Sequence, residues 1–185
     1  MLTVNPLLDP SEIRERSTDK LVESLNAEME YSLLKNKGKY SLVVATFTGK
    51  SLFQVGNRQD DAAVSKFDTG LGDSLDESAM QAWYLTEALR NAKKFGYDQN
   101  YDAWVFHDRY KSVVTIGSFN SPGDPQIRTL ATQFGAKPAR HAETGEPIEI
   151  GEYFTIPRQP RPGQLPDRSW LFDGRPELMR VPGRK

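Results

Sequence analysis

Cysteine is absent from this chain of 185 residues, and histidine occurs only twice, as His107 and His141. Without cysteine the chain has no disulfides, no thiolate metal sites and no cysteine nucleophile. The two histidines are far apart in the sequence and form no local metal-binding motif, so we expect neither a metal nor another cofactor. A catalytic Ser-His-Asp arrangement would have to use one of these two imidazoles. No nucleophile is placed beside either one by spacing, and we therefore expect no enzyme.

Long apolar runs and an excess of one charge sign are also missing. No stretch approaches the ~18 consecutive apolar residues of a membrane-spanning helix, so no transmembrane segment is expected. The 24 basic and 25 acidic residues leave a net charge of −1, whereas binding to phosphate backbones draws on a basic excess. Nucleic acid is therefore not an expected partner. Residues 1–6 contain neither the basic region nor the apolar stretch of a signal peptide, so we expect no such signal here.

The pattern that is present divides the chain into four parts. Two early prolines predict an extended arm over residues 1–18. Apolar residues spaced three and four positions apart predict an amphipathic helix over residues 19–37. Residues 38–156 carry the strand and helix patterns of one domain with its own core. Residues 157–185 are rich in proline and arginine, which predicts an extended tail lying across the domain or a partner.

Strand and helix patterns alternate within residues 38–156. The predicted strands cover residues 40–48, 103–108, 111–120 and 148–156. The predicted helices are one that begins at Ser74 or Asp76 and ends at Gly96, and a short one over residues 124–134, with a loop over residues 50–74. The resulting order β-α-β-β-α-β is that of ferredoxin-like folds. We therefore expect the α+β class, with an antiparallel sheet, two helices on one of its faces, an N-terminal helix and an extended tail.

Two of the predicted strands share a motif. Residues 40–47 read Tyr-Ser-Leu-Val-Val-Ala-Thr-Phe, and residues 112–119 read Ser-Val-Val-Thr-Ile-Gly-Ser-Phe. The first resembles the opening strand of the SPOR (sporulation-related repeat) domain, whose pattern is Tyr, any residue, Val, Gln, Val, Gly, Ser, Phe. The second resembles the third strand of that family, and residues 79–106 are similar to its middle helix and strand. The resemblance covers about residues 40–137.

The resemblance implies a SPOR-like fold and a non-enzymatic binding module of the bacterial cell envelope or periplasm. SPOR domains bind peptidoglycan glycan strands stripped of their stem peptides, along the open face of the sheet. The chain departs from the family where two polar positions of that face fall on Val43 and Val113. The alternative is a structural or assembly protein that uses the same fold and its terminal arms to bind other proteins or itself, without binding glycan.

Strand alternation predicts which side chains share the open face of the sheet. Val43, Val113 and Thr115 point to that face, and Trp104 and Phe106 share one face of a neighbouring strand. If these faces coincide, they form an apolar platform that stacks on sugar rings or on the side chains of a partner. The other interpretation is that the N-terminal helix or the tail covers the platform, since sheets usually become covered layers.

Two further sets of residues complete the candidate site. Arg109 and Tyr110 lie in the turn between two predicted strands and border the platform. In the tail, Trp170, Phe172 and Leu178 are candidate docking residues, because apolar anchors in a proline-rich segment are typical of tails that order on a partner. Wrapping of the tail around its own domain is an equal alternative. No metal-binding spacing is found.

Overall fold

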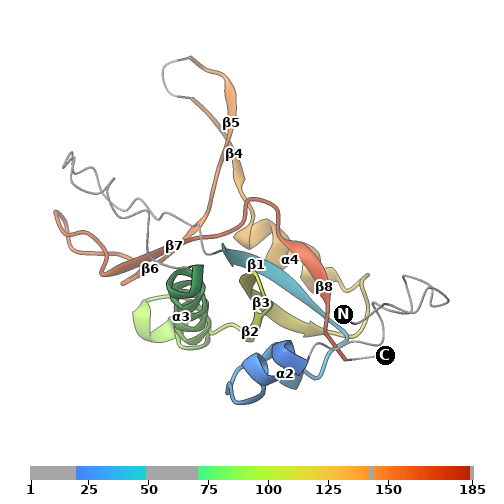
Figure 1. The fold of residues 1–185 in the computed structure, drawn as a ribbon. Coiled ribbons are helices and arrows are strands. Elements are labelled where there is room, and N and C mark those ends of the chain that lie inside the picture. The colour runs from blue at the N-terminus through green and yellow to red at the C-terminus, as the bar shows by residue number, and fades with distance from the viewer. Residues whose placement is uncertain (1–19, 49–70, 142–143, 184–185) are drawn as a thin grey trace.

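The structure, a computed structural model, describes residues 20–48, 71–141 and 144–183 (Figure 1). The expected arm over residues 1–18 and most of the expected loop over residues 50–74 lie outside these ranges. Within the described ranges, none of the helices combines the length and the apolar character that a crossing of the lipid bilayer requires.

Four strands form the central antiparallel sheet: β1 (Tyr40–Thr48), β2 (Ala103–His107), β3 (Lys111–Phe119) and β8 (Glu177–Arg180). Their order is β2-β3-β1-β8 (Figure 1). The β-branched and aromatic residues of β1 to β3 fit a pleated surface that is buried on both sides. The expected α+β class with an antiparallel sheet is confirmed.

The first face of the sheet is covered by α3 (Leu71–Arg90) and α4 (Pro125–Phe134). Asp124 caps α4, because its carboxylate accepts a hydrogen bond from the Gln126 backbone N–H at 2.9 Å. After α3 the chain forms the short 3-10 helix η2 (Ala92–Phe95) and then turns at Gly96, whose φ of 92° favours glycine. Large apolar side chains fully enclosed on this face include Leu42, Phe47, Leu85, Leu89 and Ile116.

The helix α3 starts earlier than expected. It begins at Leu71, so that Ser74 and Asp76 lie inside its first turns instead of capping it. Acidic residues near a helix N-terminus are stabilised by the helix dipole wherever the helix begins, and the same pattern is therefore compatible with several starting points.

The N-terminal helix is shorter than the expected 19–37. The structure has α2 (Lys20–Ala27) and, after a break, the 3-10 helix η1 (Leu33–Lys35). Between them the chain runs along the outer edge of β2, where the Val105 backbone N–H donates to the carbonyl oxygen of Tyr31 at 2.9 Å. The helix breaks here because residues 31 and 32 satisfy backbone groups of an edge strand that would otherwise be unpaired.

The predicted fourth strand over residues 148–156 is wrong. This region is split between β5 (Pro147–Ile150), which pairs with β4 (Lys137–Arg140), and β6 (Tyr153–Ile156), which pairs with β7 (Arg168–Leu171). Gly151 divides the region, and a Cβ there would lie 2.6 Å from Leu171 Cδ1. Hairpin partners nearby in the chain close short loops at low entropic cost, and the place beside β1 is taken by β8.

The tail after residue 156 is part of the fold: its extended course includes β7 and β8, which pair with β6 and β1, and this pairing was not expected. Trp170 is 2% exposed, and its Nε1–H donates to Gln81 Oε1 at 3.0 Å. Phe172 packs edge-on against Phe134, with ring centroids 4.8 Å apart. Of the two expectations for the tail, the structure therefore shows wrapping around its own domain, and neither aromatic side chain is presented to a partner.

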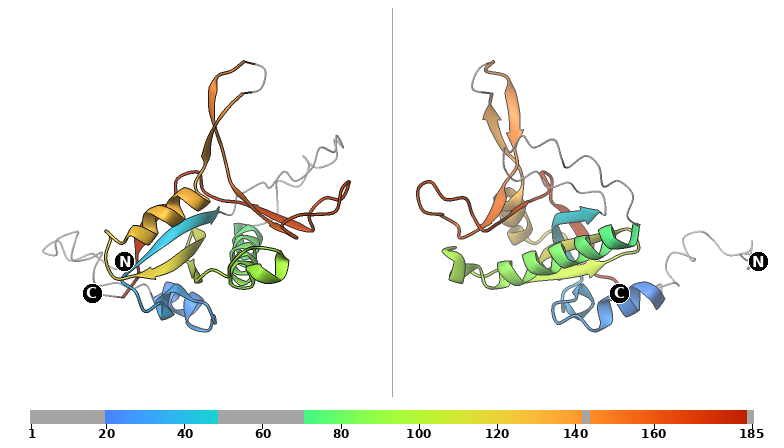
Figure 2. Two further views of the ribbon diagram at one scale, coloured as in Figure 1. Left: turned by 180° about the vertical axis from the view of Figure 1, so that it is seen from behind. Right: turned by 60° about the vertical axis from the view of Figure 1, so that its left-hand side comes forward.

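The β4–β5 ribbon stands away from the rest of the protein (Figures 1 and 2). The His141 backbone N–H donates to the Glu146 carbonyl, which places Pro138 and Pro147 at positions whose backbone points out from the two edges. Proline has no N–H to offer to an incoming strand. The ribbon edges are thereby protected against pairing with other chains.

Candidate functional site

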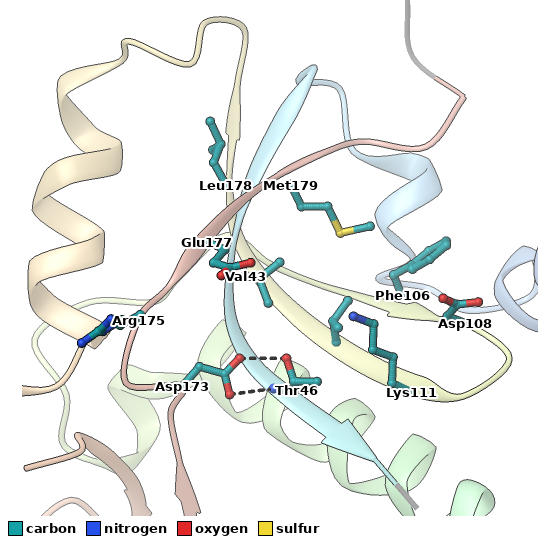
Figure 3. A pocket seen from close by; sticks show the side chains of 11 residues that line it. Val43, Thr46, Phe106, Asp108, Lys111, Asp173, Arg175, Glu177, Leu178 and Met179 are labelled. Carbon is teal, nitrogen blue, oxygen red and sulfur yellow. Dashed lines mark hydrogen bonds between the residues drawn. The ribbon is translucent and has the colours of Figure 1, made fainter. Parts of the chain in front are cut away.

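A groove lies on the second face of the sheet, opposite α3 and α4 (Figure 3). Its volume is about 590 Å³. It runs from β8 across β1 to β3 and reaches Phe106 of β2. The β2–β3 hairpin, β1 and the tail with β8, three segments distant in the sequence, thus contribute to one concave surface.

The floor of the groove is apolar. Val43 and Val113 form its centre, and Phe106 and Met179 lie at its ends. The strand β1 departs from strict alternation here, because the register shifts between Val43 and Ala45. Such a bulge turns two consecutive residues to the first face and brings Thr46 to the groove beside Val43.

Asp173 fixes the tail at one end of the groove (Figure 3). Its carboxylate accepts hydrogen bonds from the Thr46 backbone N–H at 3.2 Å and from Thr46 Oγ1 at 2.8 Å. Its own backbone N–H donates to the Val44 carbonyl at 2.8 Å. These three bonds tie the segment before β8 to the middle of β1, and the position of the rim therefore depends on them.

The rim of the groove carries both charge signs. Lys111 and Asp108 lie at the β3 side, and Glu177 and Arg175 lie at the β8 side (Figure 3). Arg175 Nη2 is 3.8 Å from Glu149 Oε1, and both side chains are exposed, so this ion pair contributes little to stability. The rim thus offers hydrogen-bond donors and acceptors on two sides of an apolar floor.

The structure brings four of the predicted site residues into the groove. Val43, Phe106 and Val113 form part of the floor, and Leu178 also lines the groove. Phe106 and Val113 are largely covered, because they pack against Val22 and other apolar residues of the second-face cluster. The buried members of this cluster are Val22, Leu33, Phe106, Val113 and Val181. The predicted platform therefore exists, and its β2 end is covered by the N-terminal helix.

Trp104 shares the second face with Phe106 and lies outside the groove. The guanidinium of Arg90 sits 4.9 Å from the centroid of the Trp104 ring and 4.4 Å from that of Tyr31, so both aromatic rings contact one cation. Among the described residues, Trp104 Nε1 is buried without a hydrogen-bond partner. The indole is therefore engaged by side chains of its own chain.

Thr115, Arg109 and Tyr110 do not line the groove. Thr115 lies on the second face opposite Val43, but it is fully buried, and its Oγ1 is 2.8 Å from Ser41 Oγ. Arg109 and Tyr110 lie in the turn between β2 and β3, where Tyr110 is 76% exposed. All three depart from the predicted site: strand alternation does not report the burial of Thr115, and proximity in sequence does not bring the turn residues Arg109 and Tyr110 to the groove.

His107 and Ser112 form a buried pair. His107 Nδ1 is 2.7 Å from Ser112 Oγ, and both side chains are largely enclosed. Burial lowers the pKa of His107, which favours the neutral imidazole. Because both groups are enclosed, this pair is not presented to a substrate. In the part of the chain that the structure describes, no three acidic, histidine or cysteine residues are grouped to hold a metal ion.

The predicted site does not include seven residues that line the groove: Thr46, Asp108, Lys111, Asp173, Arg175, Glu177 and Met179. Four of them lie in the tail, where no local pattern indicates pairing with β1. Comparison of the chain with protein-family models, with curated proteins and with solved structures found no match.

Proposed function

We propose that the protein is a non-enzymatic binding module that resembles SPOR domains and holds a segment of peptidoglycan glycan strand in the second-face groove. The observation that carries this proposal is the position of the groove, on the sheet face opposite the two helices. The strand order β2-β3-β1-β8, with α3 and α4 in the connections, supports a ferredoxin-like arrangement. Such a ligand would place the protein at the bacterial cell envelope.

The chemistry of the groove suits a sugar polymer. Sugar rings have apolar C–H faces, which fit the floor around Val43 and Val113, and hydroxyl and amide groups, which need polar partners. Lys111 can donate hydrogen bonds, and Asp108 and Glu177 can accept them.

The test is retention of the full chain on peptidoglycan sacculi, with and without amidase treatment that removes the stem peptides. We expect retention only on treated sacculi. Lys111→Glu reverses one rim charge, and we expect it to reduce retention about tenfold or more, because charge-assisted hydrogen bonds are the stronger ones. Lys93→Glu, at an exposed position outside the groove, is the matched control and should leave retention unchanged.

Failure of the intact protein to bind treated sacculi would reject glycan as the ligand. Equal loss by both lysine variants would indicate a general charge effect instead of a site in the groove.

A second candidate is an assembly protein without glycan binding. The observation that favours it is that Phe106, the one aromatic residue of the groove, is only 9% exposed. Exposed apolar side chains lie instead where the two hairpins meet, at Ile150, Tyr153 and Leu171. Light scattering distinguishes the candidates: self-association that Ile150→Asp abolishes supports assembly, and a monomer at all concentrations argues against self-assembly.

A further inference from the structure

The helix α2 closes the β2 end of the groove. Its inward face consists of Val22 and Asn26, one turn apart and both buried. Val22 packs in the second-face cluster with Phe106 and Val113, two residues of the groove floor. The apolar floor thus continues beneath α2.

Asn26 anchors α2 through an unusual pair of bonds. Its Nδ2 donates to the carbonyl oxygen of His107 at 2.7 Å, and its Oδ1 accepts from the backbone N–H of the same residue at 2.8 Å. A side-chain amide therefore occupies both backbone groups at the end of β2. These groups are buried, so that leaving them unpaired without water would be costly.

The attachment of α2 is local. The helix has eight residues, and isolated helices of this length are marginal in water. Its outward residues Leu21 and Leu25 are 50% and 45% exposed, and the packed contact is confined to the inward face. Tertiary contacts must therefore supply most of its stability.

The segment that follows is built into the fold more firmly. Leu33 and Asn36 are fully buried, and Asn36 Nδ2 donates to the Gly117 carbonyl at 3.0 Å. Asn36 Oδ1 also accepts from the Gly38 backbone N–H at 2.7 Å. Residues 31–38 can therefore remain in place when α2 leaves, with the break between α2 and η1 as the hinge.

We propose that α2 is a displaceable cover, and that its departure extends the groove across β2 and opens it to a longer segment of ligand. Phe106 and Val113, which line the groove floor but are only 9% and 4% exposed, become more accessible, and the backbone N–H and C=O of His107 are released. A ligand that replaces Asn26 needs one hydrogen-bond acceptor and one donor, as an N-acetylated sugar provides. This inference deepens the proposed function and rests on it for the identity of the ligand.

The first test needs no ligand. The chain contains no cysteine, so Val113→Cys introduces a single thiol on the covered floor, where Val113 is 4% exposed. We expect Asn26→Ala to raise the rate of thiol modification in this background about tenfold, because it removes both bonds to His107. Asn26→Asp keeps an acceptor for the His107 N–H and should give an intermediate rate.

The matched control is Ser24→Ala, which changes an exposed residue of α2 whose Oγ–H donates within the helix to the Leu21 carbonyl. In the Val113→Cys background, Ser24→Ala should leave the rate of thiol modification unchanged. Far-ultraviolet circular dichroism and thermal unfolding verify that each variant retains the sheet. Equal thiol rates in all backgrounds would overturn the proposal, as would a rise in Asn26→Ala that is accompanied by loss of the sheet.

The second test adds amidase-treated sacculi. Asn26→Ala without the cysteine should be retained about tenfold more strongly than the parent, since a larger fraction of molecules is open. Increased thiol rates together with no retention of any variant would support the displaceable cover and reject glycan as the ligand. Increased retention of Asn26→Ala on treated sacculi, without an increased rate of thiol modification, would contradict the proposal that α2 is a displaceable cover.

Discussion

The two faces of the central sheet are covered in different ways. On the first face, α3 and α4 pack over β1, β2 and β3 and enclose large side chains such as Leu85 and Leu89. On the second face, the short α2 and η1 cover the β2 end, and the groove remains toward β8. Both faces carry apolar clusters, because the central residues of β1 and β3 are largely apolar. The elements packed on each face, more than the strands themselves, therefore decide which face is closed and which keeps a groove.

The largest expected effect is the loss of stability caused by a substitution in the core of the first face. Leu85→Ala should lower the free energy of unfolding by about 2–5 kcal/mol, because Leu85 is fully buried and α3 cannot collapse into the cavity. Val22→Ala on the second face should cost about 1 kcal/mol, since it removes fewer atoms from a partly exposed helix. Urea unfolding of both variants measures the contrast. Equal losses would show that α2 is as firmly integrated as α3.

The next effect concerns the anchor of the groove rim. Asp173→Asn should lower the free energy of unfolding by about 1–2 kcal/mol, because it weakens two hydrogen bonds to Thr46. The double-mutant cycle with Thr46→Val, measured by urea unfolding, should give a coupling energy of about 1 kcal/mol. Glu146→Gln, at an exposed position in the β4–β5 ribbon, serves as control. Additive effects of the two substitutions would contradict a shared anchor.

The smallest effect depends on pH and involves the residue to which α2 is attached. Burial lowers the pKa of the His107 side chain in the folded state below its unfolded value of about 6.5. The unfolded state then binds more protons at mildly acidic pH, so stability is fully present above about pH 6.5. It decreases as the pH falls toward the folded pKa, by at most about 1.4 kcal/mol per pH unit.

Urea unfolding between pH 8 and pH 5, of the parent and of His107→Gln, isolates this contribution from that of the carboxylates. The difference in the free energy of unfolding between the parent and His107→Gln should change with pH only below about pH 6.5. A difference that is constant over the range would show that His107 has the same pKa in the folded and unfolded states.

Much of the candidate site could be predicted from local pattern. Strand alternation predicts that Trp104 and Phe106 share one face of β2, and only the structure shows that this is the face of Val43 and Val113. The bulge after Val43, which brings Thr46 into the groove, has no counterpart in that pattern. The groove residues Asp173, Arg175 and Glu177 of the tail could not be found either, because nothing near them in the sequence indicates a partner in β1.

The sequence by itself determined the strands β1, β2 and β3, the end of the segment after α3 at Gly96, and the start of α4 near Asp124. These features depend on interactions between residues close in the chain, where side-chain period and backbone preference act directly. The pairing of β8 with β1 and the covering of the β2 end of the second face by α2 depend on the tertiary structure. Both choices join distant segments with short, weakly patterned sequences, and they are settled by which arrangement buries apolar surface and satisfies the backbone of β1 and β2 together.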